Sequence, residues 1–147
     1  MIGFIKRAVL SLVALLFVSL TASAGDSIWS MQKKSSFDWN PVMDAIIKVE
    51  SEGNPNAVSG NSVGVMQITP ILVRECNNVL KKMKSNKRYT LDDRYSVEKS
   101  KEMFLLIQKY FNPENNVEKA ISSWNGGIKY SVKATNKYYK KVLAKMN

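Results

Sequence analysis

One glutamate stands among apolar side chains near the end of a predicted helix. Residues 46–55 read IIKVESEGNP. At about 100° per residue, Glu50 falls in the same arc as Ile46 and Met43, whereas Glu52 falls on the polar side. Burial and the negative end of the helix dipole both disfavour the carboxylate, so we expect a raised pKa for Glu50. A carboxyl that keeps its proton near neutral pH can act as a general acid on a glycosidic bond. A glutamate that pairs with a buried Lys or Arg, or caps loop amides, would fit the same pattern.

A glycine-containing segment follows this acid. Residues 59–70 read SGNSVGVMQITP. Gly60 and Gly64 allow the backbone to approach another backbone or a ligand closely. The amide of Gln67 has both donors and an acceptor, which suits sugar hydroxyls and N-acetyl groups. A plain turn between two helices is the alternative interpretation.

A third segment ends a later helix with an aromatic ring and an amide. Residues 122–127 read SSWNGG. The face of Trp124 suits the apolar side of a sugar ring, and the amide of Asn125 could lie at the rim of a cleft. Taken alone, the tryptophan fits equally well in a core, and the asparagine fits as a helix cap.

The elements that would position these side chains are predicted helices joined by short loops. They begin near Asn40, Thr69, Asp93 or Ser96, Asn116 and Lys129. Their apolar residues recur at three- and four-residue spacing. The predicted buried faces comprise Leu72, Cys76, Val79, Leu80 and Met83; Met103, Phe104, Ile107, Tyr110 and Phe111; Val117, Ala120, Ile121 and Trp124; and Ala134, Tyr138, Val142 and Met146. At most a very short extended segment is expected between Val63 and Gln67. The prediction is an all-α domain of about five or more helices around one core.

Composition narrows the possible chemistry. The chain has 147 residues and a formal net charge of +10, with no histidine and one cysteine. Without histidine, Ser-His-Asp and Cys-His catalysis and histidine metal sites are excluded. Cys76 is expected to be buried. The remaining candidates for chemistry are carboxylates, hydroxyls, amides and lysines, and we expect neither a metal nor a cofactor.

The N-terminus has the pattern of a secretory signal peptide. Lys6 and Arg7 precede an apolar run over residues 8–20, and small residues end at Ala24. We therefore expect a signal peptide at 1–24, a flexible lead-in at 25–37 and one domain at 38–147. The expected location is the periplasm or cell-wall space, with no membrane span after cleavage. An uncleaved N-terminal anchor is the alternative.

Together, the segments ESEGNPNAVSGNSVGVMQITP, SSWNGG and TNKYYKKVL resemble the soluble lytic transglycosylase (SLT) family of bacterial peptidoglycan-cleaving enzymes. The resemblance implies a lysozyme-like α fold. It also implies that Glu50 is the sole catalytic acid and base. The substrate-binding residues that it implies are Ser59, Gly64, Met66, Gln67, Trp124, Asn125 and Tyr138.

Several positions depart from the family pattern. Trp124 replaces a tyrosine, Ala134 replaces a glutamate and Thr69 replaces a methionine, and the loop between Ser59 and Gly64 is one residue short. None of these changes removes the acid. The altered residues keep open the alternative of a non-catalytic peptidoglycan-binding module.

The resemblance implies cleavage of the β-1,4 bond between N-acetylmuramic acid (MurNAc) and N-acetylglucosamine (GlcNAc), with formation of 1,6-anhydro-MurNAc ends. A hydrolytic muramidase on the same fold is the alternative, but it normally needs a second carboxylate. Asp92 and Asp93 are a sequence pair that fits a helix cap better than this role. The expected partner is the glycan strand, and we expect a monomer that binds no nucleic acid. The biological role could be to open the wall for a secretion or conjugation apparatus, or to take part in general wall turnover.

Overall fold

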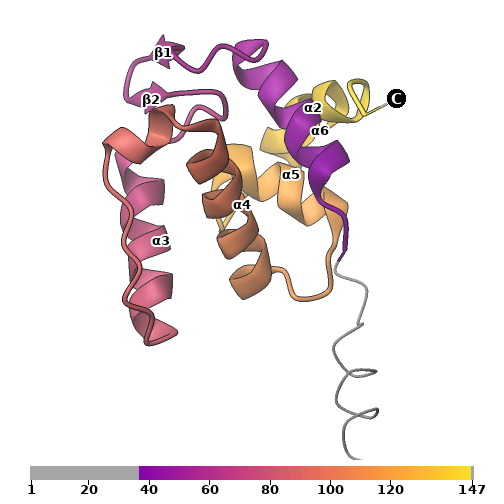
Figure 1. Ribbon diagram of the computed structural model, residues 1–147. Coiled ribbons are helices and arrows are strands. Elements are labelled where there is room, and N and C mark those ends of the chain that lie inside the picture. The colour runs from indigo at the N-terminus through magenta and orange to yellow at the C-terminus, as the bar shows by residue number, and fades with distance from the viewer. Residues whose placement is uncertain (1–36, 147) are drawn as a thin grey trace, which may run out of the picture. The chain divides into compact units, whose positions relative to one another are not determined.

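A computed structural model of the chain describes residues 37–146 (Figure 1). These residues form α2 (Asn40–Ser51), β1 (Val58–Ser59), β2 (Ser62–Val63), α3 (Pro70–Lys82), α4 (Val97–Phe111), α5 (Val117–Gly126) and α6 (Val132–Leu143), with a 3-10 helix (Asp92–Tyr95) before α4. The predicted all-α class is confirmed. The predicted signal peptide, residues 1–24, and residues 25–36 of the predicted lead-in lie outside the described residues.

Local capping explains where most of the helices begin. The side chains of Thr69, Ser96, Asn116 and Ser131 each accept a hydrogen bond from a backbone N–H in the first turn of α3, α4, α5 and α6. The cap at Ser131 also corrects one prediction. The last helix begins at Val132, rather than near Lys129.

The helices pack in two groups around one core. In Figure 1, α3 and α4 run side by side, and α2, α5 and α6 lie together on the other side of α4. Phe104 of α4 is fully buried between two tryptophans, with ring centroids 5.6 Å from Trp39 and 5.3 Å from Trp124. Cys76 is fully buried, as predicted. Within the described residues, no helix combines the length and hydrophobicity that crossing a bilayer requires.

Three residues of the predicted buried faces are exposed instead. Met83 lies beyond the end of α3 and is 43% exposed, and Tyr110 is 39% exposed. Ala134 is also exposed, because the buried face of α6 passes through Thr135 and Val142. Val142 lies seven residues after Thr135, about 20° away on the helical wheel, but eight residues after Ala134, about 80° away.

A short hairpin connects α2 to α3. β1 and β2 pair antiparallel across a two-residue turn, Val58 with Val63 and Ser59 with Ser62. Gly60 in that turn has φ of +57°, a conformation that glycine adopts readily. The extended segment therefore begins before the predicted stretch from Val63 to Gln67. Val63 also forms an isolated antiparallel bridge with Ile68, which folds the following loop back onto the hairpin.

Candidate active site

A cleft of about 480 Å³ opens beside Glu50, within the range of small-molecule sites. Its walls come from the end of α2, the hairpin and following loop, α3, the second half of α4, and α5 with the loop after it. The lining residues are Glu50, Ser59, Ser62, Gln67, Thr69, Ile71, Leu72, Glu75, Ile107, Gln108, Phe111, Asn112, Lys119, Ser123, Trp124, Asn125, Gly127 and Ile128.

Glu50 occupies the last turn of α2 and is half-buried. Its Oε1 accepts a hydrogen bond of 2.6 Å from the hydroxyl of Tyr138 on α6. Burial raises the pKa of the Glu50 carboxyl, and the Tyr138 hydrogen bond and the charge of Lys141 oppose that rise in part. No lysine or arginine within residues 37–146 forms an ion pair with Glu50. The geometry therefore differs from that of a glutamate held in a buried ion pair.

The end of α2 is tied to the loop after the hairpin, and this contact anchors the turn of the helix that carries Glu50. The hydroxyl of Ser51 donates a hydrogen bond of 2.8 Å to the carbonyl of Val65. The next residue, Glu52, ends the helix in the left-handed conformation at φ of 55° and is exposed. Glu52 was predicted to be solvated, and it is exposed and does not line the cleft.

Gln67 lines the cleft and also braces the loop after the hairpin. Its Nε2 donates hydrogen bonds of 3.0 Å to the carbonyl of Gly64 and 3.2 Å to that of Ala57. The donors of this amide are therefore used within the protein. Its Oε1 has no hydrogen-bond partner among the described residues, so Gln67 offers a ligand an acceptor. Ser59 of β1 is an exposed residue of the same wall.

Two residues expected to bind substrate lie behind the cleft wall instead. Met66 is 0% exposed and belongs to the hydrophobic core, and Gly64 is buried at φ of +79°. Neither lines the cleft. The extra Cβ of any other residue at position 64 would overlap the carbonyl of Arg94. Gly64 thus shapes the wall that carries Gln67, while Met66 supports it from inside.

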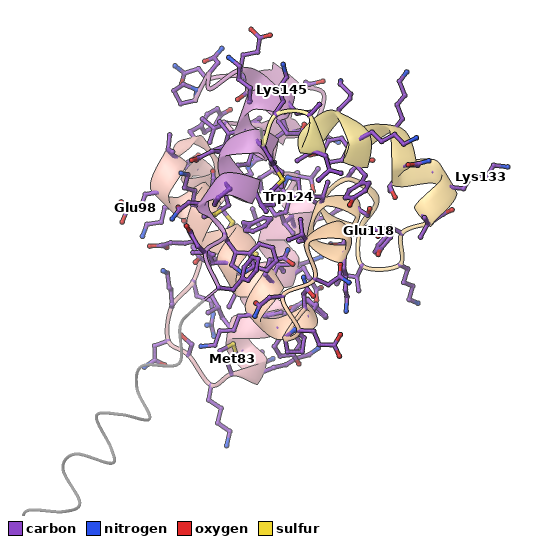
Figure 2. The ribbon with its side chains drawn as sticks, turned by 90° about the vertical axis from the view of Figure 1, so that its right-hand side faces the viewer. Met83, Glu98, Glu118, Trp124, Lys133 and Lys145 are labelled. Atoms are coloured by element: carbon purple, nitrogen blue, oxygen red, sulfur yellow. The ribbon has the colours of Figure 1, made fainter. Side chains whose placement is uncertain are left out.

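Trp124 serves the core and the cleft together. Its ring packs on Phe104, and its Nε1 donates a hydrogen bond of 3.2 Å to the carbonyl of Met66. In Figure 2, Trp124 lies near the centre of the view, and its half-buried side chain packs against the core. Part of the residue still lines the cleft, beside the exposed Asn125. Tyr138 does not line the cleft and contacts Glu50 from behind.

Sequence reasoning missed several polar residues of the cleft, among them Glu75, Gln108, Asn112 and Lys119. Glu75 lies one turn after Ile71 and Leu72, so the helical wheel applied to Glu50 would have placed it at the edge of the same face. Asp92 and Asp93, the acidic pair considered from sequence, do not line the cleft. The Asp93 carboxylate instead accepts hydrogen bonds from the backbone N–H and the hydroxyl of Thr90.

The arrangement can support acid and base chemistry on a polar ligand. A half-buried carboxyl borders a cleft whose walls offer amides, hydroxyls and apolar side chains. Residues 37–146 contain no cluster of three or more His, Cys, Asp or Glu side chains that could hold a metal ion.

A comparison with models of protein families gives a match. A family model described as the transglycosylase SLT domain matches residues 27–147, most of the chain. A search of curated proteins found no match. The matched range covers the whole region that the structure describes.

Proposed function

Since the chain belongs to the transglycosylase SLT domain family, we propose that it cleaves peptidoglycan with Glu50 as its single acid and base. Family membership supports a peptidoglycan-acting function of the lytic transglycosylase type. The finer proposal names the bond and the product. The bond is the β-1,4 link between MurNAc and GlcNAc, and the product carries a 1,6-anhydro-MurNAc end.

One observation supports this proposal most: a half-buried carboxyl with a raised pKa opens onto a cleft and has no ion-pair partner among residues 37–146. A carboxyl in this environment keeps its proton at a higher pH than an exposed one. Oε1 of Glu50 is occupied by the hydrogen bond from Tyr138. Oε2 is therefore the oxygen that can carry the transferable proton.

In the first step, Glu50 gives its proton to the oxygen that links the two sugars. The bond from that oxygen to C1 of MurNAc breaks, GlcNAc leaves with a hydroxyl, and positive charge develops at C1. The carboxylate that remains on Glu50 is stabilised by the hydrogen bond from Tyr138 and by the positive charge of Lys141. Acid assistance of this kind contributes roughly 10²–10⁴-fold to the rate.

In the second step, the Glu50 carboxylate accepts the proton of the C6 hydroxyl of MurNAc. The C6 oxygen attacks C1 of the same sugar and closes the 1,6-anhydro ring. Glu50 is protonated again, and no water is consumed. The sequence of steps needs one carboxyl that alternates between acid and base, and the hydrogen bond from Tyr138 to Glu50 supports this role for Glu50.

Hydrolysis by the same cleft is the second candidate, and Glu75 is the observation in its favour. It brings a second carboxylate to the cleft, a group that hydrolases use to activate water or to form a covalent intermediate. Glu75 fits the place of a second carboxylate better than Asp92 and Asp93, which do not line the cleft.

Mass spectrometry of the fragments released from purified sacculi distinguishes the two reactions. Transglycosylation yields anhydro ends, which are lighter by one water molecule than the reducing ends that hydrolysis yields. Anhydro products that disappear in Glu50→Gln support the proposal. Reducing ends from the wild type would replace it with hydrolysis, and binding without any cleavage would identify a non-catalytic module.

We also propose that the protein works outside the cytoplasm, in the periplasm or cell-wall space, where its substrate lies. The signal-peptide pattern at residues 1–24 supports this location. Fractionation of expressing cells, with N-terminal sequencing of the mature protein, tests the proposal. A start at Gly25 is expected, whereas an intact N-terminus in the membrane fraction would indicate an uncleaved anchor.

A further inference from the structure

The cleft continues beyond the site of the proposed reaction. In Figure 1, α3 and α4 both run away from the hairpin and from the end of α2 that carries Glu50. The polar side chains that line the cleft along this part are Glu75 of α3, Gln108 of α4, Asn112 directly after α4, and Lys119 of α5. We call these four residues the distal subsite. The two-step reaction proposed for Glu50 uses none of them.

Gln108 carries a buried hydrogen-bond donor with no partner. The residue is 2% exposed, and its Nε2 has no hydrogen-bond partner within the described residues. The orientation of the amide is fixed, because Nδ2 of Asn112 donates a hydrogen bond of 3.1 Å to Oε1 of Gln108. Asn112 is fixed in turn, since its Nδ2 also donates to the carbonyl of Asn116 and its Oδ1 accepts from the Asn116 N–H. A reversed amide at Gln108 would place two donors against each other.

A buried donor without an acceptor is costly, so this position favours a bound acceptor. Gln108 lines the cleft, but its Nε2 is buried, so a ligand oxygen reaches Nε2 only if neighbouring side chains move. The oxygen of an amide carbonyl has the right chemistry, being a strong neutral acceptor. Such carbonyls occur in the acetamido groups of the sugars and in the peptide stems of peptidoglycan.

Two opposite charges favour the peptide over the acetamido group. Glu75 and Lys119 line the cleft from different helices, and neither forms an ion pair in the part of the chain that the structure describes. A neutral acetamido group would use neither charge. A peptide offers an N–H or ammonium donor to the carboxylate and a carboxylate to the ammonium, together with amide carbonyls.

We propose that the distal subsite binds the peptide stem of peptidoglycan, with a peptide carbonyl accepting a hydrogen bond from Nε2 of Gln108. This inference rests on the proposed function, because it takes the glycan strand as the substrate. Gln108 is then a specificity-determining residue that distinguishes glycan with stems from bare glycan.

The test is a binding measurement on the Glu50→Gln protein, which cannot turn the ligand over. The two probes are a MurNAc–GlcNAc disaccharide that carries a peptide stem and the same disaccharide without it. Gln108→Glu keeps an acceptor for Asn112 but replaces the free donor by an oxygen that repels a carbonyl. We expect the preference for the peptide-bearing ligand to fall about tenfold, the scale of one lost hydrogen bond.

Glu75→Gln and Lys119→Gln are the companion variants, because both side chains are at least partly exposed and neither change should disturb the core. Each should lower the same preference while the melting temperature stays unchanged. An unaltered preference in all three variants would overturn the proposal. An equal loss for both ligands would also overturn it and would assign the Gln108 donor to an acetamido group.

Turnover of sacculi by the wild type distinguishes a failure of the proposed reaction from a failure of the proposed subsite. If the wild type releases no fragments but still prefers the peptide-bearing ligand, the proposed reaction fails and the subsite stands. If it releases anhydro fragments at the same rate from sacculi and from peptide-stripped glycan, and binds both ligands equally, the subsite fails and the reaction stands.

Discussion

The hydroxyl of Tyr138 donates a hydrogen bond of 2.6 Å to Oε1 of Glu50 and joins α6 to α2 across 88 residues of sequence. Burial raises the pKa of Tyr138, and the neighbouring Glu50 charge raises it further. The hydroxyl therefore keeps its proton and can donate it in the hydrogen bond to Glu50. This one contact fixes the position of the carboxyl and limits the rise in its pKa.

Replacing Glu50 by glutamine should abolish turnover while the fold is retained. The change removes the proton that starts the proposed reaction, so we expect a loss of at least the roughly 10²–10⁴-fold that acid–base assistance contributes. Release of soluble fragments from purified sacculi is the measurement. Glu52→Gln is the matched control, because Glu52 is exposed at the same end of α2. Substantial activity in Glu50→Gln would remove Glu50 from the mechanism.

Replacing Tyr138 by phenylalanine should change the pH dependence of activity. The hydrogen bond from Tyr138 lowers the pKa of Glu50, so its loss raises that pKa further. Activity that needs protonated Glu50 falls as pH rises through this pKa, and the alkaline limb of the profile should therefore move to higher pH. The maximal rate should fall by roughly tenfold, because the carboxyl loses its positioning contact.

Tyr139→Phe is the control for Tyr138→Phe. Tyr139 is the neighbouring half-buried tyrosine and makes no side-chain hydrogen bond within residues 37–146. Its replacement should leave the alkaline limb where it is. A Tyr138→Phe profile that superimposes on that of the wild type would show that the hydroxyl does not tune Glu50.

The helices were predictable because their signals are local. Three- and four-residue spacing of apolar side chains indicates a buried face, and the caps at Thr69 and Asn116 mark where α3 and α5 begin. The raised pKa of Glu50 was predictable for the same reason, since burial follows from its place on the α2 wheel. The predicted roles of Glu50 and of the substrate-binding residues remain predictions.

The cleft was less predictable, because it depends on how distant helices meet. Glu75 and Gln108 look like ordinary helical residues until α3, α4 and α5 are placed around the same space. Met66 and Gln67 are neighbours in the sequence, and the sequence alone could not show that one side chain enters the core while the other faces the cleft. That difference arises from the tight loop at Gln67, whose φ is 52°.

The stability of the protein should depend on the charge of Glu50. The folded-state pKa lies above the ordinary value, so the folded state binds the proton more tightly than the unfolded state does. The free energy of unfolding therefore falls as pH rises from about 4.3, the ordinary glutamate value, through the raised pKa. Glu50→Gln should be more stable than the wild type near neutral pH, and the difference should shrink in acid.

Urea unfolding of the wild type and of Glu50→Gln, from acid to neutral pH, measures the difference in their free energies of unfolding directly. Glu52→Gln again provides the matched control, because Glu52 is exposed at the same end of α2. A stability difference that stays constant with pH, or that grows toward acid, would contradict a raised pKa for Glu50.

Among the glycines of residues 37–146, Gly64 should tolerate substitution least. Its φ of +79° disfavours any side chain, and a Cβ would overlap the backbone carbonyl of Arg94, which cannot move as a flexible side chain would. Left-handed strain costs roughly 1–3 kcal/mol, and the overlap adds to it, so Gly64→Ala should lower the free energy of unfolding by about 3–5 kcal/mol.

Gly60→Ala separates the two effects, because Gly60 has φ of +57° but no atom within 4 Å of the added Cβ. That variant should lose only the strain, about 1 kcal/mol. Similar losses in the two variants, measured by urea unfolding, would show that the loop before Gln67 can shift away from Arg94. The cleft wall at Gln67 would then be less rigid than its hydrogen bonds to Gly64 and Ala57 indicate.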